Sequence, residues 1–174
     1  MPGVLVACVG NIFLSDDGFG VEVAAALSRA PMPDEVKVVD FGIRSVHLVY
    51  ELLEGYDVLV VVDTVAQQEG PPGTLYVIEP ELLSRDETAD PLPEVMLDPH
   101  DLTPGGVMSL VPTLGGAVDR ILVVGCQPEV LDDGIGLSPA VQAAVQPAAD
   151  LVREVVRREL DRLHPGPALA RGGG

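Results

Sequence analysis

The sequence predicts a three-layer α/β fold, in which an open, twisted, mostly parallel sheet of about five strands carries helices on both faces. Short runs of aliphatic residues alternate along the chain with segments of helical spacing. The chain is 47% hydrophobic but only 3% aromatic and contains no Trp, which is typical of buried parallel strands. Its 174 residues suit one domain. We expect residues 1–164 to form this α/β domain and residues 165–174 to be a flexible C-terminal tail.

The first predicted strand is Val4–Val9, a continuous apolar run that ends at Gly10-Asn11. A helix is predicted from Asp16 to Ala30, with Ser15 as its N-cap and acidic residues in its first turn. Its apolar side chains recur at helical spacing and fall on one face: Phe19, Val23, Ala26 and Leu27.

The next elements follow the same alternation. Val36–Val39 is predicted to be a second strand, Val46–Leu53 a short helix, and Val58–Val62 a third strand because it is β-branched and uncharged. Thr74–Ile78 is predicted to be a fourth strand, reached through the turn at residues 70–73. Because this connection is short and has no helix, we expect the fourth strand to run antiparallel at an edge.

The last third of the chain begins with an acidic, proline-rich segment from Glu79 to Pro99 that we interpret as loop. A helix is predicted at Leu102–Leu114 and a fifth strand at Ile121–Val124. Pro139–Leu163 is predicted to be a long helix, since Pro suits the first turn. Pro147 is expected to break or kink this helix.

Composition excludes several classes of function. The formal net charge is −17, with 10 basic residues against 27 acidic ones, so nucleic acid is not an expected partner.

Cys8 and Cys126 each lie in an apolar run and are predicted to be buried thiols of a reduced protein. No signal peptide and no apolar stretch of about 18 residues is visible. We therefore expect a cytoplasmic protein with no membrane partner.

Carboxylates follow three of the predicted strands. Asp17 comes shortly after the first strand, Asp40 ends the second, and Asp63 ends the third. In open α/β sheets, ligands bind beyond the carboxyl ends of the strands, and like charges gathered there are costly unless a cation or a proton offsets them. The alternative is that a strand-end Asp serves only as a cap or turn residue. Asp16 is interpreted as a residue that favours a helix N-terminus.

His100 stands between the predicted loop and the following helix. A lone loop His is usually a surface residue, but this loop can fold over the strand ends. Two carboxylates and one imidazole then form an O,O,N ligand set, which suits a borderline divalent ion such as Ni or Zn better than Ca. His47 and His164 are interpreted as non-catalytic residues.

Other chemistries lack their motifs. The sequence contains no GxGxxG fingerprint, no GxxxxGK[ST] loop and no GxSxG elbow. Neither cysteine has the setting of a catalytic nucleophile, because each lies inside a predicted strand.

The same residues resemble the hydrogenase maturation endopeptidase family from about Val4 to about Leu160. Residues 9–20 are similar to the family's GN-(x)3–4-DD/DE-G-x-G block. Four further blocks follow in the family's order: Asp40-Phe41-Gly42, residues 60–65 with Pro72-Gly73-Thr74, Pro99-His100, and Gly125-Cys126-Gln127-Pro128-Glu129 with residues 136–139 after it.

The resemblance implies an endopeptidase that removes the C-terminal extension of the large-subunit precursor of a [NiFe] hydrogenase after nickel insertion. The implied metal ligands are Asp17, Asp63 and His100, although many relatives carry Glu at the position of Asp17. Asp40 corresponds to a position linked to activity. The oligomeric state cannot be predicted from these motifs.

Two mechanisms follow from this resemblance. In both, Asp17, Asp63 and His100 form an incomplete shell around nickel supplied by the substrate, while other divalent ions can also occupy the site. Either a carboxylate such as Asp40 acts as general base toward water, in the manner of an aspartyl protease, or the metal polarises the scissile carbonyl or activates a bound water. The alternative function is that of a nickel-dependent assembly chaperone without hydrolytic activity.

Overall fold

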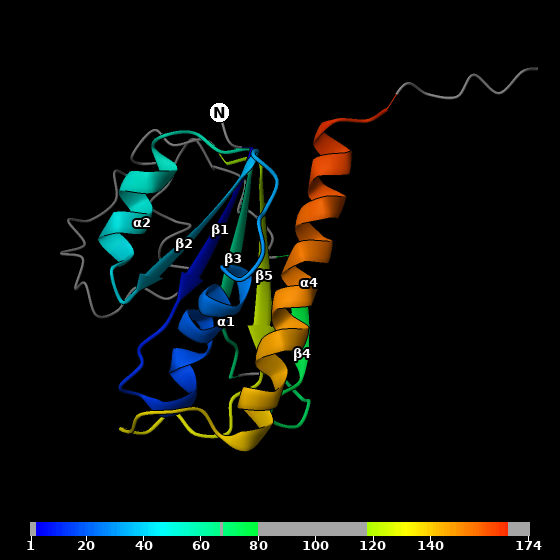
Figure 1. Ribbon diagram of the computed structural model, residues 1–174. Helices are drawn as coiled ribbons and strands as arrows, with labels where there is room; N and C mark the ends of the chain where they lie inside the picture. The colour runs from blue at the N-terminus through cyan, green and yellow to red at the C-terminus, as the bar shows by residue number, and fades with distance from the viewer. Residues whose placement is uncertain (1–2, 67, 80–117, 167–174) are drawn as a thin grey trace, which may run out of the picture.

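The computed structural model describes residues 3–66, 68–79 and 118–166 (Figure 1). Its five-stranded sheet has the strand order β2-β1-β3-β5-β4. β1, β2, β3 and β5 run parallel, and β4 runs antiparallel to β5 at the edge. The strands are β1 (Val4–Val9), β2 (Val36–Gly42), β3 (Val58–Thr64), β4 (Leu75–Ile78) and β5 (Arg120–Cys126). The predicted α/β class and the antiparallel edge strand are therefore confirmed.

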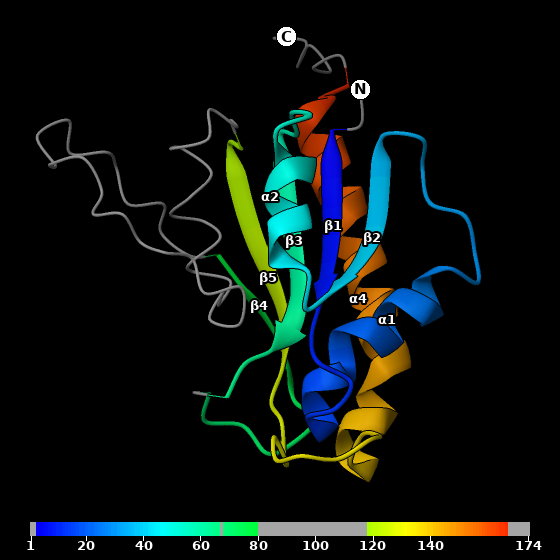
Figure 2. The same cartoon turned by 90° about the vertical axis from the view of Figure 1, so that its left-hand side faces the viewer.

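Helices cover both faces of this sheet, and Figure 2 shows helices both in front of the strands and behind them. The described helices are the 3-10 turn η1 (Ser15–Gly18), α1 (Phe19–Leu27), α2 (Ser45–Leu52) and α4 (Pro139–Leu163). α1 and α4 lie together on one face and α2 on the other. None of the helices in the described ranges is long and apolar enough to cross a membrane.

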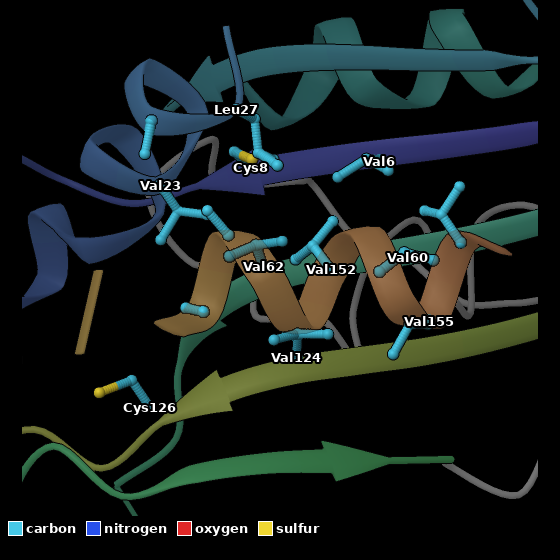
Figure 3. Close-up of a cluster of buried hydrophobic side chains, with 14 of the residues drawn as sticks. Val6, Cys8, Val23, Leu27, Val60, Val62, Val124, Cys126, Val152 and Val155 are labelled. Atoms are coloured by element: carbon cyan, nitrogen blue, oxygen red, sulfur yellow. The ribbon is translucent and has the colours of Figure 1, made fainter. Parts of the chain in front are cut away.

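The period of two along each strand divides the aliphatic side chains between two cores. Val60 and Val62 of β3 point toward α1 and α4, where they meet Val152 of α4 (Figure 3). Leu59 and Val61 point the other way and pack with the buried face of α2. Strands buried on both faces need no polar positions, and for this reason they read as continuous apolar runs.

The start of the first helix differs from the prediction. Ser15 is not the N-cap of α1: it lies in η1 with a φ of 51°, and its hydroxyl donates to the backbone oxygen of Asp132. The α-helix proper begins at Phe19, after Gly18. The hydroxyl that could have capped the helix bonds to a distant loop instead.

The C-terminal helix matches its predicted limits of Pro139 and Leu163. It is continuous through Pro147, so the predicted break does not occur. The predicted helix Leu102–Leu114 lies outside the described residues, as do the predicted loop Glu79–Pro99 except for Glu79 and most of the predicted tail.

Candidate active site

Asp17 and Asp63 come together at the carboxyl ends of β1 and β3, the lower end of the sheet in Figure 1. Two glycines allow this approach. A Cβ on Gly10 would lie 2.0 Å from the backbone oxygen of Asp17. A Cβ on Gly20 would lie 2.1 Å from the oxygen of Val9 and 2.7 Å from that of Val62. The first turn of α1 therefore rests directly on the ends of the two central strands.

Asp17 lies in η1, and both of its carboxylate oxygens are held. The backbone N–H of Asn11 donates to Oδ2 at 2.9 Å, and the hydroxyl of Thr64 donates to Oδ1 at 3.3 Å. The first bond closes the turn after β1, while the second reaches across to β3. Asp17 is thus fixed relative to the end of β3 by Thr64.

Asp63 is partly buried near the end of β3, and the backbone N–H of Thr64 donates to its Oδ1 at 2.7 Å. Burial raises the pKa of this carboxyl, and the nearby charge of Asp17 raises it further, while hydrogen bonds from Thr64 lower it. The resulting pKa is about 7. Either protonation or a bound cation therefore stabilises this carboxyl group.

Asp40 lies apart from this pair. Asp40 pairs with Cys8 of β1, and Cys8 pairs on its other side with Val62. β1 therefore separates β2 from β3, and two strand spacings put the Cα atom of Asp40 about 10 Å from that of the residue opposite it on β3. The Asp40 side chain is exposed and accepts the N–H of Gly42 at 2.9 Å. The strand order therefore separates Asp40 from Asp63.

The third predicted ligand, His100, lies outside the described residues. Within the ranges that the structure covers, no three His, Cys, Asp or Glu side chains are grouped so as to hold a metal ion. The carboxylate pair supplies two of the three predicted donors, and its hard oxygens fit a divalent cation. His47 is exposed on α2, and His164 follows the end of α4.

Asp16 has a structural role beyond that of a favourable charge at a helix end. Asp16 is fully buried, and its carboxylate accepts the N–H groups of Glu129, Val130 and Ser138 as well as the Ser138 hydroxyl. Burial raises the pKa of this carboxyl, but the four hydrogen bonds outweigh burial and hold the pKa below its usual value. Local sequence patterns cannot reveal these bonds, because the donors follow Asp16 by more than 110 residues.

The two cysteines are buried, as the sequence predicts. Burial, followed by the charge of Asp40, raises the pKa of Cys8 to about 12, and burial, followed by the charge of Asp16, raises that of Cys126 to about 11. Both remain neutral thiols near neutral pH, which is unfavourable for a nucleophile.

Comparison with known proteins gives consistent matches. The family model described as hydrogenase maturation protease matches residues 21–155. The chain is 32% identical over 155 residues to hydrogenase 2 maturation protease of Escherichia coli (strain K12), covering 88% of this chain and 90% of that protein. It is 33% identical over 177 residues to hydrogenase expression/formation protein HupD of Thiocapsa roseopersicina, covering 97% and 77%.

Solved structures agree with these matches. The hydrogenase maturating endopeptidase HybD from E. coli superposes with a TM-score of 0.70 at 27% identity, covering 90% of this chain and 93% of that one. A hydrogenase 2 maturation peptidase from a Thaumarchaeota archaeon superposes with a TM-score of 0.65 at 33% identity, covering 88% and 97%.

Proposed function

The chain belongs to the hydrogenase maturation protease family, and from this premise we propose that it removes the C-terminal extension of a nickel-loaded [NiFe]-hydrogenase large-subunit precursor. Membership makes the protein a peptidase with a role in hydrogenase maturation. The proposal adds the substrate and the means of recognition: nickel already held by the precursor is what the site binds.

The observation that carries the proposal is the adjacent pair of carboxylates, Asp17 and Asp63. The two negative charges repel each other, and burial of Asp63 disfavours its ionised form. Binding of a cation would therefore stabilise the ionised pair. Among the described residues, the hydrogen-bond donors to the Asp63 carboxyl come from Thr64, and none of them is a charged group. The substrate's nickel supplies that cation, and His100 is proposed as the third ligand.

Two routes to hydrolysis remain within this proposal. If Asp40 is the general base, the scissile bond lies at the end of β2. If the bound nickel polarises the scissile carbonyl, that bond lies beside Asp17 and Asp63. Asp40→Asn distinguishes the routes, because it abolishes cleavage in the first and leaves cleavage intact in the second, with precursor binding retained in both.

The test is to incubate the protein with precursor that has or lacks nickel and to weigh the large subunit by mass spectrometry. We expect loss of a discrete C-terminal peptide only from the nickel-loaded precursor. Asp17→Ala and His100→Ala should abolish this loss. Asp57→Ala is the matched control, since Asp57 is an exposed carboxylate at the opposite end of β3.

Three outcomes contradict the proposal. Cleavage of nickel-free precursor at the same rate would remove nickel as the recognised group. Normal processing by both ligand variants would remove these residues from the site. Binding of the precursor without any change in its mass would instead support an assembly chaperone.

A further inference from the structure

An exposed apolar surface lies beside the carboxylate pair on two loops at the same end of the sheet. Phe13 is 61% exposed and Ile135 is 83% exposed. Single exposed apolar side chains are common, but a contiguous group marks a contact surface. We call this group the apolar rim, which consists of Ile12, Phe13, Val130, Leu131 and Ile135.

Backbone pairing makes these residues one surface although the two loops are far apart in sequence. Leu14 and Gly134 form an isolated parallel bridge, with the N–H of Gly134 donating to Phe13 and the N–H of Ser15 donating to Gly134. The N–H of Asp16 donates to the oxygen of Val130 at 3.0 Å. In Figure 1 the loop at 127–138 accordingly runs beneath the loop that follows β1.

The apolar rim is also rigidly connected to the site. The side chain of Asn11 accepts the N–H of Phe13 at 2.9 Å, and the N–H of Asn11 donates to Asp17 at 2.9 Å. On the other loop, the buried carboxylate of Asp16 holds Glu129, Val130 and Ser138. A ligand on the rim therefore has a fixed position relative to the carboxylate pair, without rearrangement of either loop.

The two loops that carry the apolar rim bear charges of one sign. Exposed carboxylates at Glu129, Asp132 and Asp133 alternate with its apolar side chains. Residues 10–18 and 127–138 contain no Lys, Arg or His. A surface with an apolar centre and an anionic periphery is complementary to a partner whose apolar side chains are flanked by cations.

We infer that the apolar rim docks a segment of the large-subunit precursor in which Lys or Arg residues flank apolar side chains. This inference rests on the proposed function, because it names the part of that substrate which the protein recognises apart from nickel. The rim binds the segment next to the site, and the anionic side chains select against segments that lack flanking cations.

α2 provides a comparison surface. Val46 and Tyr50 of this helix are also exposed, as are Ile43 before it and Leu53 after it. Tyr50 is 66% exposed, close to the value for Phe13, but it lies on the opposite face of the sheet from α1 and α4. Tyr50→Ser therefore removes a similar exposed aromatic group without altering the apolar rim.

The substrate is the purified, nickel-loaded, C-terminally extended large subunit of the source organism's [NiFe] hydrogenase, and initial cleavage rates are measured against its concentration. We expect the double variant Phe13→Ser/Ile135→Ser to have a KM at least tenfold above the wild-type value and an unchanged kcat. Asp132→Lys with Asp133→Lys should raise KM and weaken its dependence on salt. Tyr50→Ser should have the wild-type KM. Circular dichroism melting of each variant shows that it is folded.

The outcomes separate the two proposals. An unchanged KM in both double variants, with an active wild-type protein, overturns the docking inference and leaves the proposed function intact. A wild-type protein that neither binds nor cleaves the precursor overturns the proposed function and the inference with it. A wild-type dimer in sedimentation that Phe13→Ser dissociates assigns the rim to self-association and overturns the inference.

Discussion

Asp63 lies close to the end of β3, with Thr64 donating to one of its oxygens and Asp17 close by. The folded protein favours the protonated carboxyl, since its pKa of about 7 is well above its value of 3.8 without the fold. At pH values where Asp63 is ionised, it lowers the free energy of unfolding. The same unfavourable charge favours the binding of a cation.

Asp63→Asn tests this residue through the free energy of unfolding. The folded pKa is raised, so the stability from the protonated form is present below pH 4 and is lost as pH rises through about 7. We expect the wild-type free energy of unfolding to fall by on the order of a few kcal/mol over this range. Asp63→Asn should remove most of that fall, because Asn keeps the acceptor for Thr64. Equal pH profiles in urea denaturation would contradict this account.

Asp16→Asn should have the opposite effect on stability. Its carboxylate accepts hydrogen bonds from three backbone N–H groups and one hydroxyl, and Asn would turn an amide donor toward some of them. We expect a loss of roughly 2 to 4 kcal/mol at pH 7 in urea denaturation. The pKa of Asp16 is lowered, so its stabilisation is present above about pH 4 and is lost as pH falls through the folded value. The loss caused by Asp16→Asn should therefore shrink in acid.

At the scale of elements, the position of α1 depends on contacts at its two ends. Its first turn lies against β1 and β3 at Gly20, where there is no room for a side chain. Its C-terminal end is covered by the guanidinium of Arg153 from α4, which donates to the backbone oxygens of Leu27, Ala30 and Pro31. Leu27 is the last residue of α1, whose final carbonyls lack partners within the helix, while Ala30 and Pro31 lie in the turn that follows.

Gly20→Ala should destabilise the protein although Ala favours helices. The added methyl group would overlap the oxygens of Val9 and Val62, so α1 must move away from the sheet. We expect a loss of about 3 kcal/mol and a matching fall in processing, because η1 and Asp17 move with the helix. Ala25→Gly, at an exposed position of α1, is the control and should cost only about 1 kcal/mol. A neutral Gly20→Ala would contradict the close contact.

Arg153→Met tests the other end of α1. It keeps the apolar stem but removes the donors to three carbonyls, and we expect a loss of about 2 kcal/mol in thermal or urea denaturation. Arg158→Met is the matched control on the same helix. Among the described residues Arg158 forms only an exposed ion pair with Glu154, which should contribute less than about 0.5 kcal/mol. Similar losses for both variants would contradict the capping role.

Sequence patterns were sufficient for elements whose cause is local. The apolar runs of β1, β3 and β5 and the Pro-initiated α4 follow from neighbouring residues, and the antiparallel β4 follows from a short connection. The patterns failed where the partner is distant: Ser15 and Asp16 bond to residues 129–138 rather than to the helix that they precede.

The candidate site shows the same division. The sequence predicts that Asp17, Asp40 and Asp63 lie near the carboxyl ends of three parallel strands, and the structure places them there. The sequence could not give the strand order, and β1 lies between β2 and β3. For this reason Asp40 and Asp63 lie two strand spacings apart, about 10 Å between their backbones. Asp17 is held on the β3 side by the hydroxyl of Thr64. His100 stays a prediction, since it lies outside the described residues.

At the scale of the whole molecule, the net charge of −17 opposes compaction through self-repulsion. We expect the thermal midpoint to rise by a few degrees between 10 mM and 200 mM NaCl, because the Debye length falls from about 30 Å to below about 10 Å. Choline chloride should give the same rise if screening is the cause. A rise confined to NaCl, or a fall in both salts, would contradict this account. Differential scanning calorimetry in the two salts is the measurement.

The bonds of Asp16 also have a consequence for the time at which the protein becomes competent during its own synthesis. Its acceptor oxygens leave the ribosome early, but their donors follow 113, 114 and 122 residues later. At about 5 to 20 residues per second, that delay is roughly 6 to 24 s. Until then the turn that carries Asp17 lacks its anchor, even if β1, β2 and β3 have already paired. The nascent chain therefore completes its site only when its last third has been translated.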